Sequence, residues 1–134
     1  MALQAYRNEF QPSSVLKSPY VMVGVNIAAA ETDAEAQWLA TTRMMTFTDL
    51  VRGKLGPTRP PIDDMDAYWS PTEKLHVQRM LARSIVGSKS AVKAELKEFL
   101  VETGAGEVII AFDIYDHKAR LRSQELAAQC MTEL

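Results

Sequence analysis

The sequence predicts an α/β fold built from parallel βαβ units, in a single domain that spans residues 1–134. Two segments, 20–27 and 107–115, are rich in Val and Ile and apolar on both faces, which is typical of buried parallel strands. Segments of helical periodicity separate the strand segments, and this alternation indicates a parallel sheet with helical crossovers. A chain of 134 residues is long enough for one such domain and too short for two.

The N-terminal half is expected to contain a helix fragment, a strand and a longer helix. Residues 2–10 form the helix fragment, and residues 20–27 form the strand. Gly24 lies inside this strand, where a glycine usually lets another backbone or a ligand approach closely. Thr32 begins a capping-box motif, which predicts the start of a helix that ends near Gly53.

The segment 53–70 is rich in Gly, Pro and Asp and shows no periodicity. A structureless run of this length in a compact domain is usually a lid, a binding loop or a disordered segment. It contains Tyr68 and Trp69, which disordered linkers tend to lack. Two interpretations remain open: the two aromatic residues dock the segment onto the core, or they face the substrate as part of a lid over an active site.

The C-terminal half is predicted to contain three helices and two strands. Residues 70–73 form a second capping box with proline at the first helical position, and they begin a helix. Residues 84–86 form a short strand and residues 107–115 the third strand. The helix between these strands ends at Gly104, and Asp116 caps a last helix.

Composition argues against several classes of function. The net charge is −2 and the basic residues are scattered, which disfavours binding of nucleic acid through its phosphates. No apolar stretch is long enough to span a membrane, and the polar N-terminus lacks the features of a signal peptide. One cysteine, Cys130, and two histidines make a protein-only metal site improbable, and the cysteine usage fits the cytoplasm.

Four motifs, taken in order, resemble the C-terminal part of the bacterial luciferase-like monooxygenases: YVMVGVNIAAAETDAEAQ, DDMDAYWSPTEK, IVGSKSAVKAELKEFL and GAGEVIIAFDIYDHKARLRSQELAA. This family consists of flavin-dependent oxidoreductases built on a (β/α)8 barrel of the TIM type. The resemblance extends from about Ala2 to Ala128. It implies that the three strands correspond to strands six to eight of the barrel, and that residues 53–70 correspond to a mobile loop that closes over the flavin.

The resemblance also implies reduced FMN as the cofactor and a separate flavin reductase as its supplier. In this family, most flavin contacts come from strands one to five, which have no counterpart in this sequence. We therefore expect a fragment or a shortened relative of such an enzyme.

Ligands of (β/α)8 barrels bind at the carboxyl ends of the strands, and three places in the sequence qualify. Gly87 and Ser88 precede a helix, whose free amides could bind a cofactor phosphate; an ordinary helix cap by Ser88 is the favoured alternative. Asn26 lies near the end of the first strand and could contact the cofactor, the substrate or a neighbouring loop.

The third place is the cluster Asp113, Tyr115 and His117 after the last strand. His117 could act as an acid or base, although an exposed position in the first turn of the helix is favoured. An unpaired carboxylate at Asp113 inside an apolar strand would be costly, so it should have a partner. We expect that partner to be Arg120, Arg122 or a ligand.

The favoured function is thus the C-terminal portion of a flavin-dependent monooxygenase, inactive as the isolated chain. The alternative is a non-catalytic half-barrel that acts as a structural or interaction module. Both predict a homo-oligomer, most simply a dimer, because the exposed strand edges need a partner. A stand-alone ligand-binding domain is disfavoured, because three strands enclose little interior.

Overall fold

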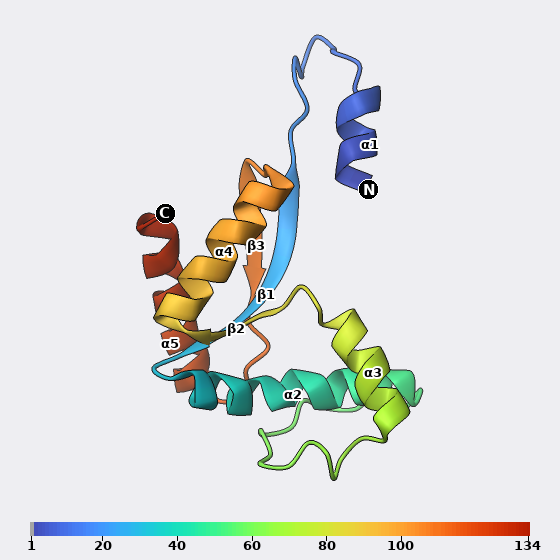
Figure 1. Cartoon of the computed structure of the whole chain (residues 1–134), viewed down its shortest axis with the longest axis vertical. Helices are drawn as coiled ribbons and strands as arrows, with labels where there is room; N and C mark the ends of the chain where they lie inside the picture. The colour runs from blue at the N-terminus through green and yellow to red at the C-terminus, as the bar shows by residue number, and fades with distance from the viewer. Residues whose placement is uncertain (1) are drawn as a thin grey trace.

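The computed structural model describes residues 2–134 and contains a three-stranded parallel sheet with five helices. The elements follow one another in the order α1 (Ala2–Glu9), β1 (Met22–Ala30), α2 (Asp33–Val51), α3 (Pro71–Met80), β2 (Ile85–Ser88), α4 (Lys89–Thr103), β3 (Glu107–Ala111) and α5 (His117–Thr132) (Figure 1). The predicted α/β class and the parallel pairing are confirmed.

The sheet has the order β2-β1-β3, with β1 in the centre. The C-terminal part of β1 pairs with β2, from Ile27 opposite Ile85 onward, and its N-terminal part pairs with β3, from Met22 opposite Glu107 onward. Three successively paired barrel strands would instead place β2 in the middle. In the order observed here, the four residues of β2 pair only with the part of β1 that β3 does not use.

One face of the sheet packs against α4 and α5 and forms the main hydrophobic core. Its buried residues alternate along β1 and are joined by residues from β2 and both helices: Val25, Ile27, Ala29, Ile85, Val92, Leu96, Leu126, Ala127 and Cys130. Burial raises the pKa of the Cys130 thiol, and the thiol donates to the backbone oxygen of Lys89 at 3.4 Å. Cys130 is therefore a core residue, as its position in the sequence indicates.

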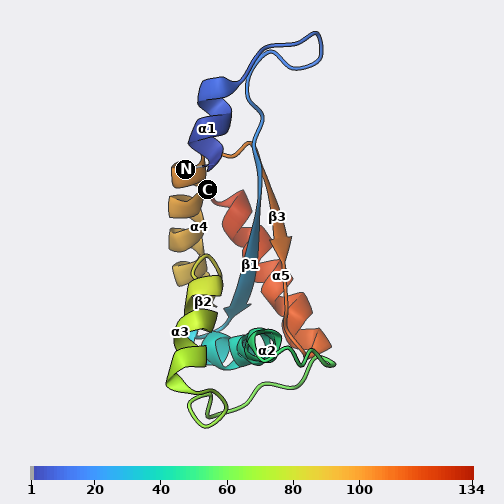
Figure 2. The ribbon, with the colours of Figure 1, turned by 90° about the vertical axis from the view of Figure 1, so that its right-hand side faces the viewer.

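The other face is covered only at its C-terminal end. There α2 crosses the strands, and its Ala36, Leu39 and Ala40 pack on Ala28 and Ala30 of β1 (Figures 1 and 2). The N-terminal end of this face, which we call the open face, consists of Met22, Gly24, Ile109 and Ala111. Met22 is 49% exposed and Ile109 is 58% exposed.

Gly24 belongs to this open face and does not show the close approach that the sequence predicts. A Cβ atom placed on it would meet nothing within 4 Å. The strand therefore carries a glycine in open space, and whatever the glycine accommodates is not part of residues 2–134.

The predicted helix starts are confirmed, whereas the strand ends differ. Thr32 accepts a hydrogen bond from the amide of Glu35, and Asp116 accepts one from Ala119 at 2.8 Å. Ser70 and Glu73 make both bonds of the capping box. β1 runs on to Ala30 and β3 already stops at Ala111, because strand ends depend on pairing with distant residues rather than on local sequence.

The first helix lies at the end of an arm formed by residues 10–21, which leads away from the sheet and back (Figures 1 and 2). None of the residues of α1 is buried. The Arg7 guanidinium donates to the carbonyl oxygens of Thr103 and Gly104 at the end of α4. Polar contacts to the end of another helix, rather than a core, therefore hold α1.

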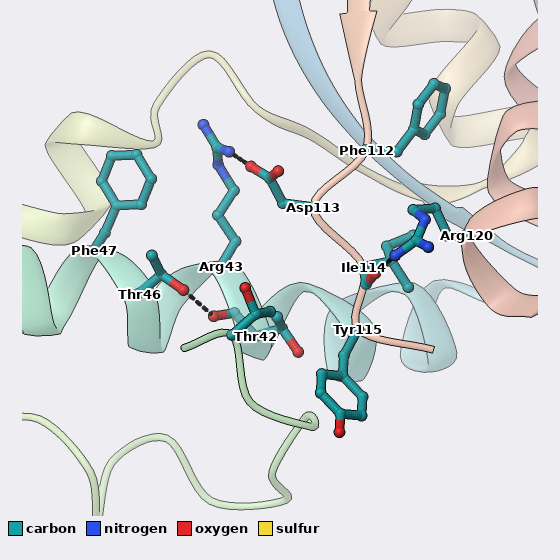
Figure 3. A pocket seen from close by; sticks show the side chains of 10 residues that line it. Thr42, Arg43, Thr46, Phe47, Phe112, Asp113, Ile114, Tyr115 and Arg120 are labelled. Carbon is teal, nitrogen blue, oxygen red and sulfur yellow. Dashed lines mark hydrogen bonds and ion pairs between the residues drawn. The ribbon is translucent and has the colours of Figure 1, made fainter. Parts of the chain in front are cut away.

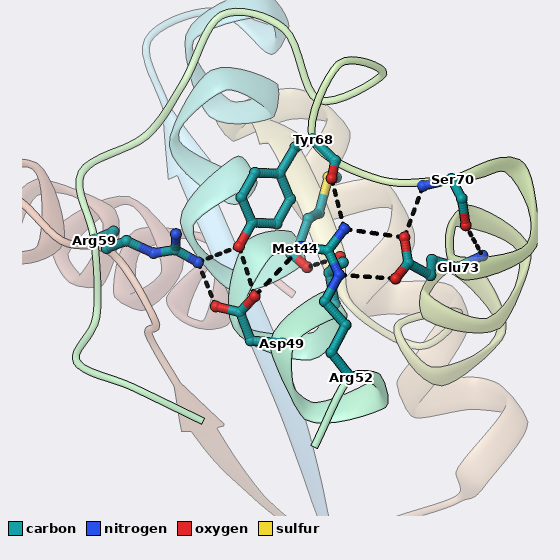
Figure 4. Close-up of polar contacts among 8 residues, drawn as sticks. Met44, Asp49, Arg52, Arg59, Tyr68, Ser70 and Glu73 are labelled. Atoms are coloured by element: carbon teal, nitrogen blue, oxygen red, sulfur yellow. Dashed lines mark hydrogen bonds and ion pairs between the residues drawn. The ribbon is translucent and has the colours of Figure 1, made fainter. Parts of the chain in front are cut away.

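A polar network fastens segment 53–70 to α2 and α3 (Figure 4). The Tyr68 hydroxyl donates to Asp49 at 2.6 Å, and Arg59 contacts both of these side chains. Arg52 donates to the backbone oxygen of Tyr68 at 2.7 Å and to Glu73 at 2.8 Å.

Trp69 anchors the same segment through its apolar surface. It is only 9% exposed and packs with Met45, Met65 and Val77. Both aromatic residues therefore dock the segment onto the helices, in line with the first of the two interpretations. Among residues 2–134, no helix combines the length and apolar character needed to cross a membrane.

A candidate site at the carboxyl ends of the strands

A cavity of about 410 Å³ lies where the chain leaves β3, between that segment and α2 (Figure 3). Its lining comes from α2, from segment 53–70, from the stretch that follows β3 and from α5: Thr42, Arg43, Thr46, Phe47, Thr58, Phe112, Asp113, Ile114, Tyr115 and Arg120. Its size lies in the range of small-molecule pockets. The carboxyl end of β3 thus meets a cavity, which is where the barrel expectation places ligand sites, but no lining residue comes from β1 or β2.

Asp113 forms the centre of a charged cluster at this cavity. It pairs with the guanidinium of Arg43 and accepts a hydrogen bond from the side-chain amide of Asn26 at 3.1 Å. Asn26 is buried in the middle of β1, not near its end as the sequence predicts, and its amide reaches Asp113 from this central strand. The prediction that Asp113 needs a partner is therefore correct, but the partner is neither Arg120 nor Arg122.

The premise of that prediction was also wrong, because Asp113 is not a buried strand residue. It follows the end of β3, and 49% of its side chain is exposed. Arg122 points elsewhere and pairs with Glu31 at 2.7 Å and with Glu125 at 3.0 Å. The sequence predicts a partner close to Asp113 along the chain, whereas the actual partner, Arg43, lies on α2, 70 positions earlier.

Arg43 is the more buried member of the ion pair, with 23% of its side chain exposed. Burial lowers the pKa of its guanidinium. The guanidinium stacks over the Phe47 ring, 4.7 Å from the ring centre, and its Nε atom is buried without a hydrogen-bond partner among the described residues. Within residues 2–134, Arg43 thus has one buried donor without a partner, and its charge is met by Asp113 alone.

Arg120 lines the other side of the cavity and makes only uncharged contacts. It donates to the carbonyl oxygen of Ile114 at 2.9 Å and to Nδ1 of His117 at 3.0 Å. None of the ion pairs formed within residues 2–134 includes Arg120. The cavity therefore has one neutralised arginine and one arginine without a counter-ion.

The structure brings some of the predicted site residues together and leaves others apart. Asp113 and Asn26 are hydrogen-bonded, and Tyr115 lines the same cavity with an exposed side chain. His117 lies in the exposed first turn of α5 and reaches the cavity only through Arg120. Tyr68 and Trp69 do not line it; from segment 53–70 only Thr58 does.

The turn at Gly87 and Ser88 does not fit the phosphate of a flavin. The Ser88 amide donates to a carboxylate oxygen of Asp33 at 2.6 Å, and this bond holds the pKa of Asp33 below its usual range. A Cβ atom at Gly87 would lie 2.8 Å from that of Ala91 and 3.1 Å from Asp33 Oδ1. The Ser88 amide is therefore already used by a carboxylate, and the close packing of Ala91 and Asp33 explains the glycine.

Ser88 also lacks the capping role that was the alternative for this turn. It occupies the N-cap position of α4, but its side chain makes no capping hydrogen bond and lies 3.2 Å from the Ser90 hydroxyl. Neither interpretation of the turn matches its geometry.

Sequence reasoning missed Arg43 altogether and considered Arg120 only as a partner for Asp113. The signal for Arg43 was weak, because an arginine within a long helix is normally a solvated surface residue. A hint lies in its place between Thr42 and Met44, within a run of α2 that is otherwise poor in charge.

Comparison with known proteins gives relatives over nearly the whole chain. The chain is 44% identical over 133 residues to the Luciferase-like monooxygenase of Escherichia coli (strain K12), and 47% identical over 127 residues to the uncharacterized protein YvbT of Bacillus subtilis (strain 168). These matches cover 99% and 95% of this chain but only 40% and 38% of the relatives. No family model matches the chain.

A crystal structure of apo-MsnO8 has a similar fold. The TM-score is 0.78 at 29% identity, and the match covers 98% of this chain and 40% of that chain. The chain thus spans about two fifths of the length of the proteins that it resembles, both in sequence and in structure.

Proposed function

The chain belongs to the luciferase-like monooxygenases, matching about 40% of the length of a curated member, and from this we propose that it forms the C-terminal portion of a flavin-dependent monooxygenase barrel. The complete barrel would bind reduced FMN, which supplies the activation of oxygen, and would oxygenate an organic substrate. The isolated chain is inactive in this proposal, since it has only part of the barrel.

The open face is the observation that carries the proposal. Met22 and Ile109 are large apolar side chains on a strand face that no helix covers. In a (β/α)8 barrel, the face of each strand opposite the outer helices points into a packed interior. With α4 and α5 on one side, the open face corresponds to that interior, and the remaining strands would bury it.

The cavity at the strand ends gives the chain its part in the active site. Ligands of such barrels bind at this end, and here the Arg43–Asp113 pair on one side and Arg120 on the other line a cavity that also contains aromatic side chains. The Gly87–Ser88 turn does not accept a phosphate, so we assign the flavin contacts to the part of the relatives that this chain does not match, and derive no flavin step from its residues.

The test is to co-express the chain with the part of the Escherichia coli relative that it does not match. A stable one-to-one complex that binds FMN is expected, while the isolated chain binds none. A flavin reductase, NADH and oxygen can then be added to measure oxygen consumption in excess of the reductase alone. Failure to form a complex, or FMN binding by the isolated chain that equals that of the complex, would contradict the proposal.

A second candidate function rests on the same open face. Two copies of the chain could bury it against each other and form a non-catalytic dimer that serves as an interaction module. The co-expression experiment separates the two candidates, because a chain that stays dimeric and excludes the complementary part supports this alternative.

A further inference from the structure

Arg120 is the cation with spare hydrogen-bond donors at the cavity. It uses two of its five N–H groups, one toward Ile114 and one toward His117. The carboxylate at the cavity, Asp113, already receives bonds from Arg43 and Asn26. The lining also contains threonine hydroxyls, which can donate or accept. A ligand group that binds Arg120 must therefore be an acceptor.

The charges at the cavity favour the same kind of ligand. Arg43 and Asp113 neutralise each other, and among residues 2–134 no carboxylate forms an ion pair with Arg120. Arg120 lies in the first two turns of α5, where the helix dipole disfavours a cation. An anionic group next to Arg120 would offset both unfavourable effects, and an arginine binds planar carboxylates through two parallel bonds.

The rest of the lining mixes aromatic side chains with the hydroxyls of Thr42, Thr46 and Thr58. The Phe47 ring comes from α2 and the Tyr115 ring lies at the exposed rim, and we call these two rings the aromatic wall (Figure 3). Aromatic rings can hold the hydrocarbon part of a ligand, while polar groups fix its orientation. The lining thus combines a cation without an ion-pair partner, polar hydroxyls and an aromatic wall.

We propose that this cavity binds the substrate through a carboxylate, with Arg120 as the counter-ion and the aromatic wall as the contact for an apolar chain. The proposal rests on the function proposed above, because it names the class of substrate for that site: organic carboxylates with an apolar body. Arg120 is a binding residue in this assignment, and Tyr115, with its free hydroxyl at the rim, is a further donor to the carboxylate.

Octanoate is a suitable probe, and the binding can be followed on the full chain by backbone amide NMR and calorimetry without flavin, oxygen or reductase. Shifts are expected for the amides of Phe112, Ile114 and Tyr115. Octanol should bind at least about tenfold more weakly, since it lacks the charge that Arg120 pairs with. Equal binding of octanol and octanoate would overturn the proposal, because the charge would then contribute nothing.

Substitutions in α5 supply the matched comparison. Arg120→Gln should weaken octanoate binding at least about tenfold and Arg120→Lys should restore part of it. Arg122→Gln, two positions away and paired with Glu31 and Glu125, should leave it unchanged. Equal loss in both glutamine variants would overturn the assignment. If Arg120→Gln is unfolded by circular dichroism, the salt dependence of octanoate binding to the unmodified chain decides, since ion pairing predicts weaker binding at high salt.

Inorganic phosphate distinguishes a substrate site from a cofactor site. Phosphate should not displace octanoate, because it makes no use of the aromatic wall. Displacement would overturn the assignment to an amphiphilic carboxylate. These measurements contain no flavin, so a lack of octanoate binding would not change the result of the co-expression experiment. Conversely, octanoate binding can still be measured if the chain forms no complex with the complementary part of the barrel.

Discussion

Arg43 and Asp113 are the residues on which the electrostatics of the strand-end cavity depend. Arg43 is largely buried and stacks on Phe47, so its charge requires a nearby anion. Asp113 supplies that anion while remaining half exposed, and Asn26 orients it from the sheet. The pair joins α2 to the end of β3 and shapes the cavity before any ligand is bound.

Replacing Asp113 by asparagine should therefore destabilise the fold. The change leaves the Arg43 charge partly buried without its partner, and we expect a loss of about 1 kcal/mol because the pair is partly solvated. Urea unfolding followed by circular dichroism measures the effect. Glu98→Gln on the exposed surface of α4 is the control and should change little. Equal unfolding midpoints for Asp113→Asn and the unmodified chain would rule out this role.

Glu73 should make stability depend on acid pH. Hydrogen bonds from Arg52 and from the Ser70 amide lower the pKa of Glu73 from 4.5 to about 2. A carboxyl with a lowered pKa in the folded state stabilises above its unfolded value, and this contribution is lost as the pH falls from 4.5 toward 2. The free energy of unfolding should fall over this range, and less steeply in Glu73→Gln. Identical slopes in the two proteins would contradict the prediction.

Helix starts are the elements that local sequence determines most directly. α3 begins at a complete capping box of Ser70 and Glu73, whereas α4 begins at Ser88 without a side-chain cap. The difference arises because Asp33 of α2 has taken the Ser88 amide. One serine therefore stabilises its helix through its side chain, and the other only occupies the equivalent position.

Alanine substitution should separate these two serines. Ser70→Ala should lower the free energy of unfolding by about 1 kcal/mol. The Glu73 amide loses its acceptor, and the Ser70 amide loses the capping-box arrangement that positions Glu73. Ser88→Ala should cost less than about 0.5 kcal/mol, since no capping bond is lost. Chemical denaturation of both variants provides the measurement. A larger loss of unfolding free energy in Ser88→Ala than in Ser70→Ala would contradict the view that only Ser70 caps its helix.

The elements were predictable where neighbouring residues decide them. The caps at Thr32, Ser70 and Asp116 and the left-handed Gly104 act within one turn of their helices, so their motifs suffice. The order of the strands depends instead on which segments pair across the sheet, which no local motif encodes. The Arg43–Asp113 ion pair could not be predicted for the same reason, since it joins α2 to the end of β3.

The whole molecule presents an incompletely covered sheet. One face carries the core with α4 and α5, and the open face exposes Met22 and Ile109 to solvent. Contiguous apolar surface of this kind normally marks an interface. We therefore predict that this face binds either a second copy of the chain or the complementary part of a barrel.

Charge placed on the open face should prevent that association. The unmodified chain should self-associate as its concentration rises, and Ile109→Lys should shift it to the monomer. Val101→Lys, at a 77% exposed position on α4, is the control and should leave association unchanged. Sedimentation velocity or light scattering after gel filtration measures the mass. A purely monomeric unmodified chain at high concentration would refute self-association through this face.

The central place of β1 has a consequence for synthesis on the ribosome. The pairing of Met22 with Glu107 means that this strand leaves the exit tunnel long before its neighbours are made. At typical rates of translation the delay is on the order of ten seconds. During that time neither β2 nor β3 is available to pair with this apolar segment, so nascent-chain chaperones should recognise residues 21–30.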